Sequence, residues 1–327
     1  MDKDEKRPTS DIKEDIQFRM DLVVEDSEVL EEDEDGVRVG QVMKPNPERY
    51  DRVDDGEQKG WIDTFENTFI PEDVLAEMWE EQAEGLPIYY SPDQIDDWQE
   101  YCTEIYNSLY TIFDKNGLIA PSSTDTGFLK QYAESQDEIH PFVILKADLV
   151  GSTKMAARYD SDLYYRILAA FEYLVVDVVR KHNGYYLKKE GDGIYAFFPS
   201  PNTTGKHDNA ALCALRIKNL VSDLLSGALS DNGYSEVEVT IGLDSGNPEI
   251  VPDGNDNFEL IGLTMNLASK IADAAEPNEV LLGQFTERNL HTKYRKMTQE
   301  VTQDREWGFS EGDTLYPIYL LKDVIQP

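Results

Sequence analysis

Two aspartates, each at the end of a short apolar run and close to glycine, are the residues best suited to chemistry. Asp148 follows the run VILKA of residues 143–147, and Asp192 stands in the GDG of residues 191–193. A carboxylate at the end of a buried strand costs free energy unless a charged group lies against it. We therefore expect the two carboxylates to share a divalent cation.

Such a site would suit phosphoryl transfer. Two divalent ions can activate an attacking hydroxyl and stabilise the departing phosphate oxygens. Mg²⁺ fits because it prefers carboxylates and substrate phosphates as ligands, and the Leu149 carbonyl is a further candidate ligand. Gly191 and Gly193 permit a tight hairpin and a close approach of a triphosphate. Taken singly, an Asp before a helix is also a common cap and Gly-Asp-Gly a common hairpin turn.

Alternating strand and helix patterns over residues 141–325 would position these carboxylates. A strand at 142–148 leads through GST into one long helix that ends at Asn183-Gly184, a natural helix stop. The remaining expected elements are strands on both sides of the GDG turn, a helix at 209–225, a strand at 237–243 that pairs with 249–251, a helix at 264–275, and strands at 280–282 and 317–321. This order predicts an α/β fold, an α+β sandwich of ferredoxin-like character.

The first 140 residues are different in composition. Residues 1–60 are dominated by Asp and Glu and predict a disordered acidic tail. Residues 61–136 predict a helical extension of unknown role, with helix starts at Pro71 and Pro92. Its clearest element is one amphipathic helix, whose apolar residues have helical spacing: Tyr101, Ile105, Leu109 and Ile112.

Composition excludes several classes of partner. The 327 residues include 65 acidic and 30 basic ones, for a formal net charge of −35. A chain this acidic has no electrostatic reason to bind nucleic acid or an anionic membrane. Two cysteines, a charged start and the absence of a long apolar stretch predict a cytoplasmic protein. His182, at a helix end, and His207, in a loop, are expected at the surface rather than on a metal, because neither has a second histidine at ligand spacing.

Three separated motifs resemble the bacterial class III nucleotidyl cyclases. ADLVGST at 147–153 is similar to their first metal motif, and KKEGDG at 188–193 is similar to their second. GLTMNLASK at 262–270 resembles their transition-state helix, and IGLDSG at 241–246 matches the strand and turn between. The motifs keep the family's order and spacing, and the resemblance covers about residues 141–322.

The resemblance implies cyclisation of a nucleoside triphosphate, in which the ribose 3′-hydroxyl attacks the α-phosphorus and pyrophosphate leaves. It implies two Mg²⁺ or Mn²⁺ ions per site, with Asp148 and Asp192 as their ligands. Asn266 falls at the position that orients the ribose, and Lys270 at the position that stabilises the pentavalent phosphate. It further implies a head-to-tail homodimer with two sites, each built from both chains.

The sequence departs from the family pattern at two places. Lys270 stands where the family usually has arginine, so the charge is kept and the planar fork is lost. Trp307 stands where the family commonly has a lysine that reaches the triphosphate, and Arg305 is the possible substitute. A catalytically weak cyclase-homology domain that serves dimerisation or scaffolding is therefore an alternative.

Lys188 and Glu259 fall at the base-reading positions of the family. A lysine donor beside a carboxylate acceptor matches adenine or cytosine, and mismatches guanine or uracil. We expect an adenylate cyclase first, and second a pyrimidine (CTP or UTP) cyclase similar to those of anti-phage signalling. Two other hypotheses remain. In the first, Lys188 and Glu259 form a salt bridge at an interface. In the second, the domain is a polymerase-like palm that gives linear or dinucleotide products.

Overall fold

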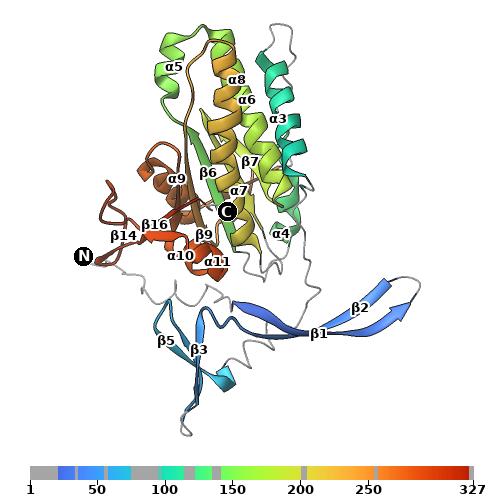
Figure 1. Cartoon of the computed structure of the whole chain (residues 1–327). Helices are drawn as coiled ribbons and strands as arrows, with labels where there is room; N and C mark the ends of the chain where they lie inside the picture. Colours follow the sequence, from blue (N-terminus) through green and yellow to red (C-terminus); the bar gives the residue numbers. More distant parts are fainter. Residues whose placement is uncertain are drawn as a thin grey trace. The chain divides into compact units, whose positions relative to one another are not determined.

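Strand β6 (Phe142–Leu149) lies in the middle of a large sheet, as its apolar sequence predicts. Residues of both its faces are buried, which is typical of a strand covered on two sides. In this computed structural model, the described residues form a seven-stranded sheet (Figure 1). Its order is β13 (Thr298–Glu300), β16 (Ile318–Leu321), β12 (Glu279–Gly283), β9 (Val239–Gly246), β6, β8 (Gly193–Phe198) and β7 (Tyr185–Glu190).

The structure describes residues 21–33, 36–54, 58–74, 95, 97–113, 122–134, 141–199, 205–253 and 257–323. They divide into two compact units. The larger unit holds the described residues from 95 to 323 apart from 291–293. The smaller unit holds residues 21–74 together with 291–293.

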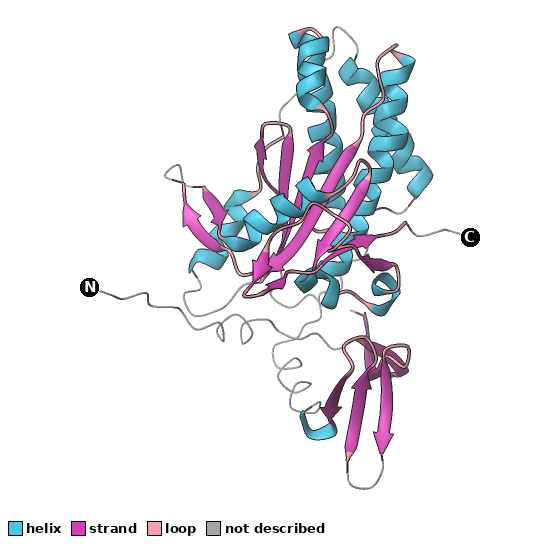
Figure 2. Cartoon of the chain, turned by 90° about the vertical axis from the view of Figure 1, so that its left-hand side faces the viewer, coloured by secondary structure: helices cyan, strands magenta, loops and turns pink. Residues whose placement is uncertain are grey.

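Helices cover both faces of the large sheet (Figure 2). On one face, α6 (Ser161–Lys181), α7 (Lys206–Leu220) and α3 (Trp98–Phe113) share an apolar core with Val143 and Leu145. On the other, α9 (Leu263–Ala274) and η1 (Thr126–Leu129) pack with Phe142 and Ile144. The predicted sandwich is confirmed.

Two details of the predicted order differ. The single helix expected after residue 153 is two helices, α5 (Ser152–Arg158) and α6, because Asp160 caps α6 by accepting a hydrogen bond from the Leu163 amide. The predicted pairing of 249–251 with the strand at 237–243 is wrong. Strand β10 (Glu249–Pro252) pairs instead with β11 (Phe258–Ile261), in a separate antiparallel pair.

The other predicted strands and helices of this unit are present. The helix expected at 209–225 is longer, because α7 continues through a π-helical turn, η2 (Val221–Leu225), into α8 (Ser226–Asp231). The remaining elements between residues 126 and 323 are α4 (Lys130–Glu134), α10 (Gln284–Arg288), α11 (Thr292–Arg295), β14 (Ser310–Glu311) and β15 (Thr314–Leu315).

The prediction of a disordered tail over residues 1–60 is wrong for the described residues between 22 and 54. β1 (Leu22–Asp33) and β2 (Gly36–Pro45) form an antiparallel hairpin, and β3 (Tyr50–Asp54), β4 (Lys59–Asp63) and β5 (Thr68–Pro71) form a three-stranded sheet. In β2, Val37 and Val39 lie on either side of Arg38, a short strand pattern that the high acidic content obscures. Residues 1–20 lie outside the described part of the chain.

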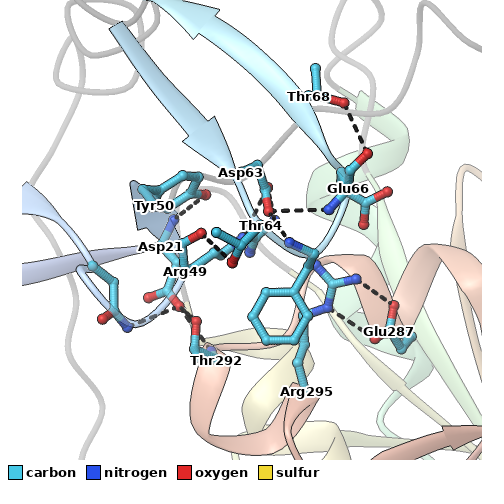
Figure 3. A network of polar contacts seen from close by, with 12 residues as sticks. Asp21, Arg49, Tyr50, Asp63, Thr64, Glu66, Thr68, Glu287, Thr292 and Arg295 are labelled. Carbon is cyan, nitrogen blue, oxygen red and sulfur yellow. Dashed lines mark hydrogen bonds and ion pairs between the residues drawn. The ribbon is translucent and has the colours of Figure 1, made fainter. Parts of the chain in front are cut away.

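A buried ion pair organises the three-stranded sheet (Figure 3). Arg49 donates from Nε and Nη2 to Asp63 Oδ2, at 3.0 and 2.8 Å, and both side chains are almost fully buried. The other oxygen, Asp63 Oδ1, accepts from the amides of Phe65 and Glu66. A buried pair of charges is tolerated when its remaining atoms are hydrogen-bonded in this way.

Part of the helical extension predicted for residues 61–136 is helical, in α3, η1 and α4, whereas β4 and β5 are strands. Trp61 lies in β4 rather than in a helix. Residues 72–74 are helical after Pro71, whereas Pro92 lies outside the described residues. Helix α3 buries the four predicted residues, and Tyr101 donates to Asp177 of α6 at 2.8 Å. This helix is therefore part of the larger unit and no separate domain.

Candidate active site

The turn between β7 and β8 brings Asp192 close to Asp148. Ala147 of β6 pairs with Ile194 of β8, so the end of β6 lies beside the start of β8. Gly191 has a φ of 64°, which favours glycine, and completes the turn. A Cβ on Gly193 would lie 3.1 Å from Asp148 Oδ1, so this glycine leaves room for the carboxylate.

The two predicted metal carboxylates affect each other electrostatically. Burial raises the pKa of Asp148, Lys146 opposes that change, and the charge of Asp192 raises the pKa further. Two like charges at one place repel unless a cation lies between or beside them. The structure therefore brings together the pair that the sequence singled out.

Lys146 supplies a cation at this place. Its Nζ lies 3.3 Å from Asp148 Oδ2 and also contacts Ser269 and Asp273 of α9. Burial opposes the charged form of Lys146, but the two carboxylates raise its pKa above the usual value. The sequence reasoning missed this lysine. Its spacing of two residues from Asp148 on one strand is the signal that it shares a face with the aspartate.

The donor set fits Mg²⁺ or Mn²⁺ in a substrate-assisted site. Among the described residues, no group of three or more His, Cys, Asp or Glu side chains is arranged to hold a metal. Asp148 and Asp192 offer two carboxylates, and Leu149 offers only its backbone, because its side chain is buried in the core. Mg²⁺ commonly takes one or two carboxylates and completes its shell with substrate phosphates and water.

The residues predicted to read the base lie on different sheets and do not pair with each other. Lys188 pairs with Glu190 at 3.3 Å, and its Nζ lies 5.8 Å from the centre of the Tyr195 ring. Glu259 is exposed on β11, which belongs to a different sheet. In the described part of the chain, no hydrogen bond or ion pair joins Lys188 to Glu259.

Helix α9 presents Asn266 and Lys270 on its exposed face. Both are exposed, one turn apart, whereas Met265 and Ala268 are buried against the sheet. Close by, the apolar side chains of Ile261 and Leu263 are 42% and 51% exposed. Helix α9 and the residues before it thus present polar and apolar groups that are exposed in the described part of the chain.

The two positions near residue 305 have structural contacts. Arg305 Nη2 donates to both carboxylate oxygens of Glu279, at 2.8 and 2.9 Å. Trp307 donates from its indole to the Tyr316 carbonyl at 2.8 Å and packs with Phe309. In this conformation Arg305 is bound by a carboxylate rather than free to take a lysine's place on a triphosphate.

The prediction that His182 and His207 lie at the surface is wrong. Both are buried, at 3% and 8% exposure. His182 Nδ1 lies 2.6 Å from the Val178 carbonyl and Nε2 lies 2.7 Å from Arg216 Nη1. Because a carbonyl only accepts and a guanidinium only donates, this geometry assigns a neutral ring with its proton on Nδ1. His182 therefore joins α6 to α7 as a structural residue.

Comparison with known proteins identifies the family. Residues 132–315 match the family model of the adenylate and guanylate cyclase catalytic domain. That is more than half of the chain, and the chain belongs to this family. Its predicted resemblance to class III cyclases is confirmed.

Individual relatives are distant. An uncharacterized protein of Mycobacterium tuberculosis is 29% identical over 187 residues, which are 55% of this chain and 31% of that protein. The uridylate cyclase of Burkholderia cepacia is 22% identical over 205 residues, covering 61% of this chain and 86% of that protein. The chain thus spans about a third of the length of the mycobacterial relative.

A solved structure supports the fold. The adenylyl cyclase CyaB from P. aeruginosa superposes with a TM-score of 0.50 and 18% identity, covering 57% of this chain and 96% of that one. Among the helices of the described residues, none has the length and apolar character needed to cross a bilayer.

Proposed function

We propose that this chain is a nucleotidyl cyclase that converts a nucleoside triphosphate to its 3′,5′-cyclic monophosphate and pyrophosphate. The observation that carries the proposal is the meeting of Asp148 and Asp192, whose charges interact at the end of β6. The family match supports the same reaction type. With a triphosphate as substrate, we place the reaction in the cytoplasm.

In this proposal Asp148, Asp192 and the Leu149 carbonyl hold the metal. Two Mg²⁺ or Mn²⁺ ions, when bound, supply the charge that acidifies the ribose 3′-hydroxyl and stabilises the pyrophosphate. Asn266 orients the ribose so that the 3′-oxygen attacks the α-phosphorus in line with the leaving oxygen. Lys270 lies one turn further on α9 and stabilises the negative charge that develops on the phosphate.

We infer a head-to-tail homodimer with two such sites. Lys188, Glu259, Asn266 and Lys270 of one copy would face the metal carboxylates of the other. The exposed α9 face and its apolar neighbours Ile261 and Leu263 support this, because a second copy would cover them. Lys188 and Glu259 lie on different sheets, and in this proposal the bound base joins them.

ATP is the first choice of substrate, since a lysine donor and a glutamate acceptor match the adenine edge. A pyrimidine triphosphate is the second candidate. The observation that favours it is the similarity to a relative named as a uridylate cyclase. CTP presents the same donor and acceptor order as ATP, whereas UTP would need the opposite order at these two residues.

One assay tests the proposal and separates its alternatives. Purified full-length chain is incubated with Mn²⁺ or Mg²⁺ and each of the four triphosphates, and the products are identified by mass. A cyclic monophosphate from one triphosphate supports the proposal and names the base. Linear or dinucleotide products indicate a palm-type enzyme. No turnover and no metal-dependent nucleotide binding would indicate a scaffold.

Variants of Lys270 sharpen the same assay. Lys270→Ala should lower kcat by about 100-fold, the usual loss when one donor to the transition state is removed. Lys270→Arg keeps the charge and adds the planar fork, so it should retain kcat or raise it. Equal activity of the alanine variant and the unaltered chain would remove Lys270 from the mechanism.

A further inference from the structure

Lys146 joins strand β6 to helix α9 beside the proposed metal site. Its ammonium lies 3.3 Å from Asp148 Oδ2, 3.3 Å from Ser269 Oγ and 3.4 Å from Asp273 Oδ1. The lysine side chain is only 11% exposed. A lysine has three N–H donors, and these three oxygens match them. The ammonium therefore has a fixed place between the strand and the helix.

This place conflicts with a metal ion on Asp148. Lys146 and Asp148 are two residues apart on one strand, so their side chains lie on the same face. A divalent cation bound to Asp148 would be close to the ammonium, and two cations repel strongly where water is partly excluded. The ammonium has a second anchorage, because Ser269 and Asp273 lie one turn apart on α9.

We propose that Lys146 is a built-in counter-ion, which holds Asp148 before metal binds and is held by Ser269 and Asp273 of α9 afterwards. The inference rests on the proposed function, because it takes Asp148 as a metal ligand. Lys146 then has two effects. It lowers the affinity of the chain for metal alone, and it links metal binding to the helix that carries Asn266 and Lys270.

The contacts of Lys146 with α9 explain how its ammonium stays paired when a metal ion takes Asp148. An ammonium that lost its only carboxylate would be an unpaired buried charge, which is costly. Asp273 is 62% exposed and keeps a negative charge within reach of Lys146. The ring of Tyr195, 5.9 Å from the ammonium, gives a further weak attraction on the same face.

The experiment measures binding of Mn²⁺ alone to the full chain, without nucleotide, from the electron paramagnetic resonance signal of the free ion. Lys146→Met should tighten Mn²⁺ binding by about tenfold, because a neighbouring like charge is removed. Lys146→Arg keeps the charge and should bind as the unaltered chain does. Lys189→Met is the matched control, since Lys189 lies on the same sheet but pairs with Glu172 at 2.9 Å, and it should leave the affinity unchanged.

A double-mutant cycle tests the second anchorage. Asp273→Asn should weaken Mn²⁺ binding in the unaltered chain, because Lys146 then depends more on Asp148. In the Lys146→Met background the same change should have little effect. Equal weakening in both backgrounds would show that Asp273 acts without Lys146 and would overturn the transfer to α9.

Asp148→Asn separates this inference from the proposed function. If that variant binds Mn²⁺ as tightly as the unaltered chain, Asp148 is no ligand and the metal part of the proposed function fails. If Asp148→Asn loses binding while Lys146→Met binds like the unaltered chain, the function stands and the role of Lys146 is overturned. If circular dichroism shows that Lys146→Met is unfolded, Lys146→Gln is used in its place. Glutamine keeps hydrogen-bond donors but has no charge. Absence of Mn²⁺ binding in every variant also overturns the inference.

Discussion

Asp148 and Asp244 lie on adjacent antiparallel strands of one sheet, and their surroundings are opposite in character. The Asp148 side chain is 27% exposed and lies against the ammonium of Lys146. Asp244 is 1% exposed and accepts a hydrogen bond from the Tyr316 hydroxyl at 2.8 Å. Burial raises the pKa of Asp244 to about 7. Lys146 opposes the rise in pKa that burial causes at Asp148, whereas Asp244 holds its proton up to neutral pH.

Both carboxylates lie against a glycine, with different clearance. A Cβ on Gly193 would be 3.1 Å from Asp148 Oδ1, a contact that a small shift relieves. A Cβ on Gly283 would be 2.2 Å from Asp244 Oδ1 and 2.9 Å from the Tyr316 hydroxyl. The first carboxylate has room to take a ligand. The second is enclosed by its own fold, which suits packing rather than catalysis.

The largest expected effect separates the two aspartates by activity. Asp148→Ala should lower turnover by at least about 1,000-fold, or about 4 kcal/mol of transition-state stabilisation, because a metal carboxylate is lost. Asp192→Ala should lower turnover by a similar factor. Asp244→Asn should keep turnover within about threefold of the unaltered chain, because Asp244 lies outside the metal site. Pyrophosphate release under saturating triphosphate measures all three. Asp162→Ala, at an exposed carboxylate on α6, is the control.

The next effect distinguishes Asp244 from Asp148 by the pH dependence of stability. The folded-state pKa of Asp244, about 7, lies above its usual value of 3.8, so the folded state binds this proton more tightly than the unfolded state. The contribution of Asp244 to the free energy of unfolding is therefore fully present below about pH 4. It is lost as the pH rises through about 7. Between pH 5 and 8 the loss should be about 3 kcal/mol.

Asp244→Asn cannot ionise and should lack this loss. Relative to the unaltered chain, its free energy of unfolding in urea should therefore rise by about 3 kcal/mol from pH 5 to pH 8. Asp162→Asn serves as the reference for a surface carboxylate. A difference between Asp244→Asn and the unaltered chain that stays constant with pH would mean that Asp244 is ionised throughout.

The contrast also explains what the sequence was able to predict. Asp148 and Asp192 each stand in a short motif that the sequence displays, and they meet because β6 pairs with β8 across the intervening helices. Asp244 depends on Tyr316, 72 residues further along the chain, and no local pattern indicates that contact. Lys146 falls between these cases: its strand spacing places it beside Asp148, but its partner helix α9 is far away in sequence.

Other differences have similar physical causes. The acidic composition of β1 and β2 outweighs the short alternating pattern in β2, so the sequence does not predict their hairpin. His182 was assigned to the surface from its place at a helix end, yet packing of α7 against α6 buries it. Long apolar helices and strands of the larger unit were predicted well, because burial imposes their periodicity directly.

The two glycines provide a smaller test. Gly283→Ala should destabilise the fold by about 2 kcal/mol, a typical cost of overpacking, because neither Asp244 nor Tyr316 has space to move. Gly193→Ala should cost less than about 1 kcal/mol, since Asp148 is partly exposed and able to shift. Thermal unfolding of both variants measures the difference. Equal losses would show that the two carboxylates are equally confined.

The smallest effect concerns the hydroxyl that faces Asp244. Tyr316→Phe removes the donor to Asp244 and the acceptor of the Phe285 amide, so the free energy of unfolding should fall by about 1–2 kcal/mol. The loss should be larger at pH 8 than at pH 5, because the ionised carboxylate needs the donor more.

Tyr186→Phe is the matched control for that hydroxyl. Tyr186 donates to Glu172, which keeps Lys189 as a partner when the hydroxyl is removed. The loss in free energy of unfolding of Tyr186→Phe should therefore stay below about 1 kcal/mol and change little with pH. The same pH dependence in both variants would mean that the hydroxyl of Tyr316 has no special relation to Asp244, and the contrast between the two aspartates would then depend on burial alone.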